Sequence, residues 1–335
     1  MAVRYAEQVQ KAVSLVLLAF AIGCSGSDAA SDGGGEFTWT EVTPCPVARF
    51  EASGVVVDGE LWVMGGFRSS MLDVSKRIDI YDPRTDRWRV GPELPGAETH
   101  AGIVSLGKDF LLLAGFEGNV LGRVTTAGVW RRNVAAGSWS SGPDLPSPRA
   151  AVFAGLIDNV VHAAGGLGLD GNSDFGEHVV WDLAGPPVWN PAAPLSNPRN
   201  HGGGSASAGK FFAISGRHGW DEYTGDDPAL DAYDPTTDSW AARAPMPVPR
   251  SEIGSATVGL SDGRLLTVGG SVPDKKPSGD VLIYDPLQDS WSTLPSLPLP
   301  LKGVVAARIG KQVIVTTGSP TSTDPTDKTY LGCCL

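Results

Sequence analysis

The sequence predicts an all-β fold made of repeated units, and three series of residues with a common period predict it. Tryptophans recur every 49 to 51 residues: Trp39, Trp88, Trp139, Trp189, Trp240 and Trp291. Glycines recur in the same way: Gly66, Gly115, Gly166, Gly216, Gly270 and Gly318. A third series is aromatic: Tyr81, Trp130, Trp181, Tyr233 and Tyr284. Periods of about 50 residues are typical of repeat arrays and propellers.

Each unit has the pattern of four short strands. In the first unit, residues 53–57 ("SGVVV") and 60–66 ("ELWVMGG") predict two strands joined by a tight Asp58-Gly59 turn. Residues 77–83 ("RIDIYDP") predict a third strand ended by proline, and residues 86–90 ("DRWRV") a fourth. No helical periodicity follows the first 36 residues. We expect the recurrent tryptophans, glycines and Asp-Pro pairs to serve packing and turns.

This unit resembles the kelch repeat, in which a double glycine, an aromatic followed by Asp-Pro, and a tryptophan about seven residues later mark one four-stranded unit. Five or six such units cover residues 37–335. The resemblance implies that the units are the blades of a β-propeller, a closed ring that leaves no sheet edge bare.

The repeat also predicts how the ring closes. Trp39 precedes the first glycine pair, whereas no tryptophan follows Gly318. Residues 37–42 ("FTWTEV") are therefore expected to form the outer strand of the last blade, beside the C-terminal segment 328–335. The predicted fold is an all-β, six-bladed β-propeller of four-stranded kelch blades, closed by an N-terminal strand.

The N-terminal residues predict export. The apolar run of residues 12–22 is shorter than the about 20 residues that cross a bilayer, and it has the length of a signal-peptide core. Residues 21–24 ("AIGC") resemble a bacterial lipobox, which implies cleavage before Cys24 and lipidation of that residue. An ordinary signal peptide with an incidental cysteine is the alternative.

The predicted organisation has three parts. A lipoprotein signal peptide covers residues 1–23, the lipidated Cys24 and a Gly/Ser/Asp tether cover 24–36, and the propeller covers 37–335. We expect an exported protein, lipid-anchored to the bacterial outer membrane or cell envelope, or otherwise secreted. The membrane is contacted through the lipid only, and a monomer is expected.

Composition excludes some functions. The net charge of −11 and the absence of a basic run exclude nucleic acid as a partner. The three remaining cysteines, Cys45, Cys333 and Cys334, are an odd number and do not predict a disulfide framework. A vicinal disulfide between Cys333 and Cys334 is one alternative; free, buried thiols are expected.

Arginines recur just before the first strand of four units: Arg49, Arg149, Arg199 and Arg250. His100 and Lys302 lie near that phase in the other two units. In a propeller these arginines are expected to ring the mouth of the central channel, close to the long loops 167–178 and 217–231. There they predict a site for an anionic ligand, because guanidinium groups suit carboxylates. The alternative is that each arginine pairs with a loop carboxylate and pins the loop.

The candidate ligand-binding residues are Arg49, Arg149, Arg199, Arg250, His201, Arg217, Asp221 and Glu222. Asp170, Asn172 and Asp174 form a weak calcium pattern, because Phe175 replaces the glycine of a calcium loop and the closing glutamate is missing. No other metal and no cofactor is predicted, and no phosphate loop or catalytic triad is present in the sequence.

Two functions fit these features. The first is a surface-tethered, non-catalytic module that binds protein or glycan through the loop-rich face and channel mouth. The alternative is a small enzyme on anionic sugars that resembles N-acetylneuraminate epimerase, a six-bladed kelch protein with arginines and acids at its channel mouth. An enzyme with the copper site of galactose oxidase is disfavoured, because no cysteine lies in the interior of the repeat.

Overall fold

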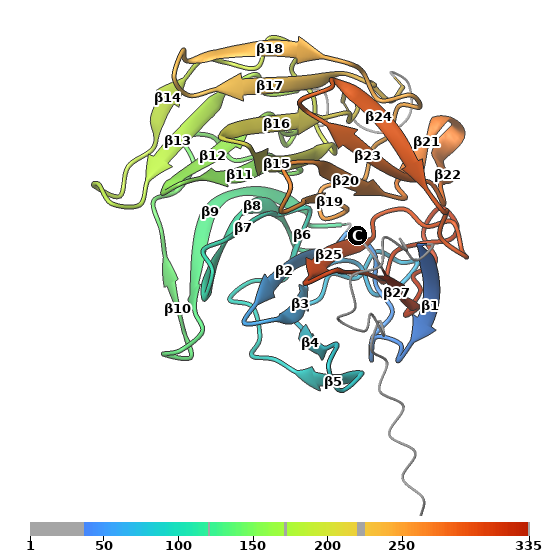
Figure 1. The fold of residues 1–335 in the computed structure, drawn as a ribbon. Coiled ribbons are helices and arrows are strands. Elements are labelled where there is room, and N and C mark those ends of the chain that lie inside the picture. The colour runs from blue at the N-terminus through green and yellow to red at the C-terminus, as the bar shows by residue number, and fades with distance from the viewer. Residues whose placement is uncertain (1–36, 120, 171–172, 220–224, 334–335) are drawn as a thin grey trace, which may run out of the picture. The chain divides into compact units, whose positions relative to one another are not determined.

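Six small antiparallel sheets form the blades of a six-bladed β-propeller (Figure 1), which confirms the fold predicted from the repeat. The computed structural model describes residues 37–119, 121–170, 173–219 and 225–333. Cys24, the signal peptide and the tether lie outside these residues. Innermost strands of consecutive blades are neighbours all around the ring, and the innermost strand of the last blade lies beside that of the first.

The strands of each blade run in sequence order from the axis outward. Blade 1 comprises β2 (Ser53–Val57), β3 (Glu60–Met64), β4 (Ile78–Asp82) and β5 (Arg87–Val90). Blade 2 comprises β7 (Gly102–Ser105), β8 (Asp109–Glu117), β9 (Val124–Asn133) and β10 (Ser138–Ser141), with the short β6 (Glu98–Thr99) paired to β8. Blade 3 comprises β11 (Phe153–Ile157), β12 (Val160–Ala164), β13 (His178–Asp182) and β14 (Asn190–Ala192).

The second half of the ring repeats the pattern. Blade 4 comprises β15 (Gly203–Ser207), β16 (Lys210–Ile214), β17 (Leu230–Asp234) and β18 (Ser239–Arg243). Blade 5 comprises β19 (Thr257–Gly259), β20 (Leu265–Val268), β23 (Val281–Asp285) and β24 (Ser290–Leu294). Its long loop carries β21 (Ser271–Val272), the 3-10 turn η1 (Pro273–Lys275) and β22 (Lys276–Pro277).

Blade 6 joins the two ends of the propeller. It comprises β25 (Val305–Ile309), β26 (Gln312–Thr316) and β27 (Thr329–Cys333), and its outer strand is β1 (Thr38–Val42). β1 pairs antiparallel with β27, with Trp39 opposite Gly332 (Figure 1). Gly332 is required here, because a Cβ atom would lie 2.9 Å from the indole of Trp39. The predicted closure by an N-terminal strand is confirmed.

The six recurrent tryptophans join neighbouring blades. Each indole Nε1 donates a hydrogen bond to a backbone carbonyl of the preceding blade; that of Trp139, for example, donates to Glu93 at 3.0 Å. The other five donors are Trp39, Trp88, Trp189, Trp240 and Trp291. Buried tryptophans commonly combine apolar packing with such a polar contact. Their structural role, expected from the repeat, is confirmed.

The Tyr-Asp-Pro motif makes a second link between blades. In blade 4 the Tyr233 hydroxyl donates to Asp238 at 2.8 Å, and Asp238 also accepts from the backbone N–H of Ala193 in blade 3 at 2.8 Å. Tyr81 with Asp86, and Tyr284 with Asp289, repeat the arrangement.

Two further features bear on the sequence-based expectations. Cys45 is a free, buried cysteine, as expected, whereas Cys333 is disulfide-bonded, which corrects the expectation for that residue. Within the described ranges, no helix is long and apolar enough to cross a membrane.

Candidate functional site

The four recurrent arginines do not line the channel mouth. The side chains of Arg49, Arg149, Arg199 and Arg250 are at most 1% exposed. Each pairs with a carboxylate at the start of the third strand of its own blade: Asp79, Glu177, Asp231 and Asp280, respectively. The expected position of these arginines is therefore wrong, and the geometry is that of loop pins.

Arg199 shows how such a pin works. Its guanidinium lies 2.8 Å from the Asp231 carboxylate and donates to the carbonyls of Ser215 at 2.9 Å and Ala213 at 2.8 Å. These contacts join the segment before the first strand to the second and third strands of the blade. A buried charge needs this complete set of partners.

Two residues after each arginine position, a different set of residues lines the channel. The six equivalent residues are Glu51, His100, Ala151, His201, Glu252 and Gly303, each one residue after a backbone bridge to the loop that follows the second strand. All six have φ between 52° and 58°. This left-handed conformation is uncommon outside glycine, and its recurrence in every blade shows that the ring imposes it.

Backbone hydrogen bonds between blades hold these six positions. The N–H of Glu51 donates to Gly303 O at 2.8 Å, and that of Ala151 to His100 O at 2.9 Å. The N–H of His201 donates to Ala151 O at 3.3 Å. The side chains therefore project from a rigid frame, as a binding constellation requires.

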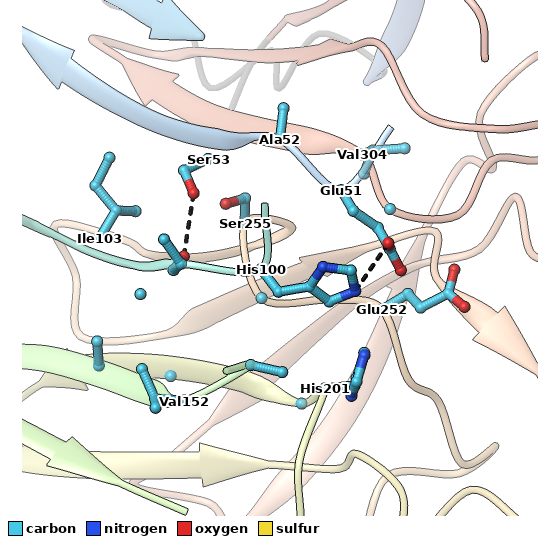
Figure 2. A pocket seen from close by; sticks show the side chains of 18 residues that line it. Glu51, Ala52, Ser53, His100, Ile103, Val152, His201, Glu252, Ser255 and Val304 are labelled. Atoms are coloured by element: carbon cyan, nitrogen blue, oxygen red, sulfur yellow. Dashed lines mark hydrogen bonds and ion pairs between the residues drawn. The ribbon is translucent and has the colours of Figure 1, made fainter. Parts of the chain in front are cut away.

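All six positions line one cavity at the channel mouth, of about 60 Å³. Figure 2 shows Glu51, His100, His201 and Glu252 around it. One probe-sized volume of about 10–15 Å³ holds a water molecule, so this cavity suits an ion with a few waters or a small polar group.

Acidic and basic groups face one another around the cavity. His100 Nε2 lies 2.8 Å from Glu51 Oε2. Glu252 Oε1 lies 3.3 Å from Lys302 Nζ and 3.4 Å from Arg217 Nη1. The site is therefore mixed in charge rather than uniformly basic.

Burial and charge set the ionisation of two of these groups. Burial alone raises the pKa of the Glu51 carboxyl, but the charge and hydrogen bond of His100 outweigh it and leave that pKa below its ordinary value. Burial, reinforced by the charge of Arg217, holds the pKa of His201 well below its ordinary value. At neutral pH Glu51 is a carboxylate and His201 is a neutral imidazole.

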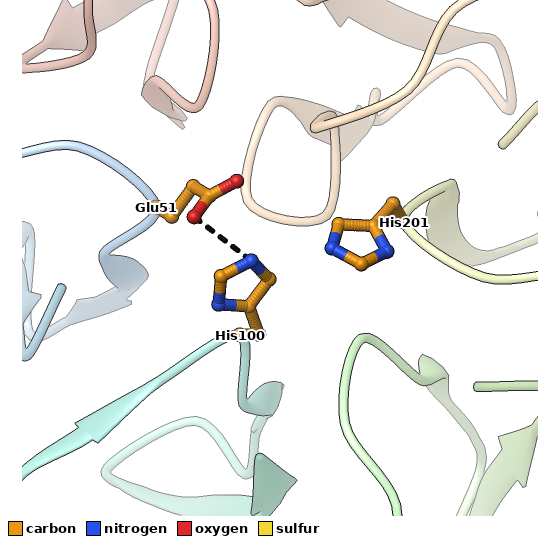
Figure 3. A group of neighbouring side chains, drawn as sticks. All are labelled: Glu51, His100 and His201. Carbon is orange, nitrogen blue, oxygen red and sulfur yellow. Dashed lines mark ion pairs between the residues drawn. The ribbon is translucent and has the colours of Figure 1, made fainter. Parts of the chain in front are cut away.

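Three potential metal-ligating side chains lie close together at the channel mouth. Among the described residues, Glu51, His100 and His201 each offer a ligand atom, and these atoms lie within 4.8 Å of one another (Figure 3). Glu51 comes from the entry to blade 1, His100 from blade 2 and His201 from blade 4, so only the closed ring brings them together.

The structure shows where the other predicted site residues lie. His201 lies in the cavity, and Arg217, beside Glu252, is 7% exposed. Asp221 and Glu222 lie outside the described residues. Sequence reasoning missed Glu51 and Glu252 and noted His100 only for its phase. Aligning the second residue after each arginine position would have revealed this column of acids and histidines.

The carboxylates of the calcium-like pattern, Asp170 and Asp174, accept hydrogen bonds within and between loops. Asp174 accepts hydrogen bonds from Asn200 Nδ2 and from the backbone N–H of Gly219, and lies 3.4 Å from His218 Nδ1. The Asp170 carboxylate accepts the backbone N–H of Ser173 at 2.9 Å. Asn172 lies outside the described residues. The described part of this pattern does not gather into a group of metal ligands.

Comparison with known proteins gives consistent matches. The family model for the Kelch motif matches residues 48–95 and 254–298. The chain is similar to Kelch-like protein terF of Aspergillus terreus, with 30% identity over 224 residues, 63% of this chain and 48% of that protein. It is also similar to Kelch-like protein 25 of Xenopus tropicalis (30% over 183 residues; 52% and 30% covered) and Kelch-like protein 34 of Homo sapiens (26% over 273 residues; 76% and 40%). The chain thus spans less than half the length of these relatives.

Proposed function

Because this chain is a kelch-repeat β-propeller, we propose that it is a non-catalytic module that binds another protein through the loop-rich face around the channel mouth. Kelch propellers commonly act in protein–protein binding. Fold alone does not assign function, so the proposal needs a feature of this surface.

The supporting observation is a set of exposed apolar side chains on that face. Met71, Leu121 and Leu169 are 78%, 99% and 59% exposed. They lie in the loops between the second and third strands of blades 1, 2 and 3, which are consecutive in the ring. These loops share a face with the segments that enter each first strand, as the bridge between Phe50 and Phe67 shows. Apolar side chains that recur on one face are typical of a protein-binding surface.

Replacing Met71, Leu121 and Leu169 together by aspartate is expected to abolish binding, because a hydrophobic contact surface tolerates no buried, unpaired charge. Partners would be captured by cross-linking in extracts of the source organism, purified, and tested for direct binding by biolayer interferometry. Leu287→Asp is the matched control, because Leu287 is 91% exposed on a turn of the opposite face. Equal binding by the triple variant and the wild type would contradict the proposal.

The alternative enzyme on anionic sugars is not supported by this geometry. It depended on arginines at the channel mouth, and Arg49, Arg149, Arg199 and Arg250 are buried in ion pairs. Glycan binding likewise has no observation in its favour among the described residues.

We also propose that the chain is exported and lipid-anchored through Cys24, with residues 25–36 as the tether. The support is the sequence of residues 12–24 alone; the relatives bear only on the propeller. In a bacterial host, Cys24→Ser is expected to move the protein from the membrane fraction to the soluble exported fraction, because one acyl-bearing residue supplies the whole membrane affinity. Intact-mass analysis would check for the lipid. An unlipidated wild-type protein would overturn this proposal and leave the binding proposal intact.

A further inference from the structure

We propose that Glu51, His100 and His201 form a binding site for a divalent transition-metal ion of the zinc class at the channel mouth. This inference is independent of the proposed protein binding. Two imidazoles and one carboxylate are a common donor set for Zn²⁺ with a fourth position left open. The nitrogen donors select against Ca²⁺ and Mg²⁺, which prefer oxygen ligands.

The distances suit one shared ion. The three donor atoms lie within 4.8 Å of one another, and His100 Nε2 lies 2.8 Å from Glu51 Oε2. With Zn–N and Zn–O bonds of about 2.0–2.2 Å, neighbouring donors of a tetrahedral ion lie roughly 3.3–3.5 Å apart. Small side-chain rotations therefore complete the geometry, and the cavity beside the trio has room for a water as the fourth ligand.

Hydrogen bonds already fix His100 in the tautomer that a metal ligand needs. Thr99 Oγ1 donates its one hydrogen to the carbonyl of Glu51 at 2.9 Å, so it accepts the hydrogen bond from His100 Nδ1 at 3.0 Å. Nδ1 is therefore the donor, and Nε2 faces the Glu51 carboxylate. His100 Nε2 and Glu51 Oε2 face one another at 2.8 Å, and a metal ion would bind between them.

His201 is oriented in the same way. Asn200 Nδ2 donates to Asp174 and to the carbonyl of Gly219, which leaves Asn200 Oδ1 to accept from His201 Nδ1. Figure 3 shows the other ring nitrogen of His201 turned toward His100 and Glu51. Within the described part of the chain, that nitrogen forms no hydrogen bond. Metal-binding histidines usually donate their second ring N–H in this way, which sets the tautomer and the ring orientation.

The backbone and the charges agree with this assignment. The left-handed conformation of Glu51, His100 and His201 is imposed by the closed ring, so the three side chains are preorganised. Lys302 and Arg217 lie close enough to repel a cation, but both face Glu252. Glu51 supplies the negative charge within the trio, and Glu252 faces the positive charges of Lys302 and Arg217 beside it.

The test is titration of the full-length protein, first stripped with a chelator, with Co²⁺ as a spectroscopic substitute for Zn²⁺. Visible d–d absorption with a stoichiometry of one ion per chain is expected, and Zn²⁺ should displace it. His100→Asn, His201→Asn and Glu51→Gln should each weaken binding by at least about tenfold, because each removes one of three ligands. Asparagine tolerates the left-handed backbone at both histidine positions, so these variants are expected to fold; circular dichroism checks this.

His218→Asn is the matched control. His218 contacts Asp227 of its own loop and Asp174 of the neighbouring loop, and it lies outside the trio. Unchanged Co²⁺ binding by this variant, together with loss in the three trio variants, would support the site. Loss in His218→Asn with retention in His201→Asn would place the ion on the loop and overturn the proposal. No one-to-one binding by the folded wild type would overturn it as well.

The variant Thr99→Val tests whether the orientation of the His100 ring contributes to metal binding. The variant keeps the shape of Thr99 but removes the acceptor for His100 Nδ1. Loss of such an outer partner typically weakens metal affinity by about 10- to 100-fold. An unchanged Co²⁺ affinity would show that the His100 orientation does not serve an ion.

Discussion

Acidification from pH 6.5 to pH 5 is expected to remove about 3 kcal/mol of stability through one pair of buried histidines, His162 and His178. His162 Nδ1 lies 3.0 Å from His178 Nε2, both residues are 1% exposed, and both rings lie against Phe211. Burial lowers the pKa of His162 to about 3, with a further contribution from His178, and lowers that of His178 to about 4.

The lowered pKa values determine in which direction stability changes with pH. Both pKa values are lower in the folded state than the ordinary 6.5 of the unfolded chain. The stabilising effect is therefore complete above pH 6.5 and is lost as the pH falls toward 4, because the unfolded chain takes up protons that the folded protein excludes. Each histidine contributes about 0.7 kcal/mol per pH unit at pH 6.5, where half of the unfolded imidazoles are protonated, and about 1.3 kcal/mol per pH unit at pH 5.

The measurement is urea unfolding at pH 6.5 and pH 5 of the wild type and of the double variant His162→Phe/His178→Phe. Other buried groups titrate in this range; burial raises the pKa of Glu98 to about 8, with the opposite sign. The comparison is therefore between the two pH dependences, and the variant should lose about 3 kcal/mol less than the wild type. His218→Asn, at a half-exposed histidine, is the control. Equal losses in wild type and double variant would refute the assignment.

Arg199→Ala is expected to destabilise the propeller by about 3–5 kcal/mol, because it leaves the Asp231 carboxylate buried without its cation and frees several carbonyls. Thermal and urea unfolding would measure the change. Arg131→Ala is the matched control, since Arg131 pairs with Asp109 at the surface and is 45% exposed; it should cost less than about 1 kcal/mol.

A second variant tests the reason for that loss. Arg199→Met/Asp231→Leu removes both charges, and we expect it to recover part of the stability, because a buried pair costs much of its attraction in desolvation. If Arg199→Ala unfolds no more easily than Arg131→Ala, the arginine is not a structural pin. The ligand-binding role expected from the sequence would then need to be reconsidered.

The fold was predictable because its determinants are periodic. Trp39 lies ahead of Gly66, the first glycine of the repeat series, and no tryptophan follows Gly318. This offset was enough to place β1 in the last blade, and the pairing of Trp39 with Gly332 confirms it. Strand alternation and the spacing of tryptophans predict the structure correctly because each unit packs only on its neighbours.

The site was less predictable because it depends on the direction of single side chains. Arg199 and His201 lie two residues apart, yet one is buried within its blade and the other faces the channel. The left-handed φ of 56° at His201 produces this change of direction, and no periodicity in the sequence announces it. In blade 2, Glu98 occupies the position that an arginine holds in four other blades, so the repeat does not predict the side chain there either.

The pairing of β1 with β27 has a consequence for biosynthesis. Thr38 and Cys333 are opposite each other in the register, so the ring cannot close until residue 333 has left the ribosome. Closing a loop of almost the whole chain is entropically costly and late, whereas each hairpin forms locally. The nascent protein must therefore pass through an open state in which the faces of the first and last blades are uncovered. Uncovered apolar faces of this kind are prone to aggregation until the two ends of the propeller pair.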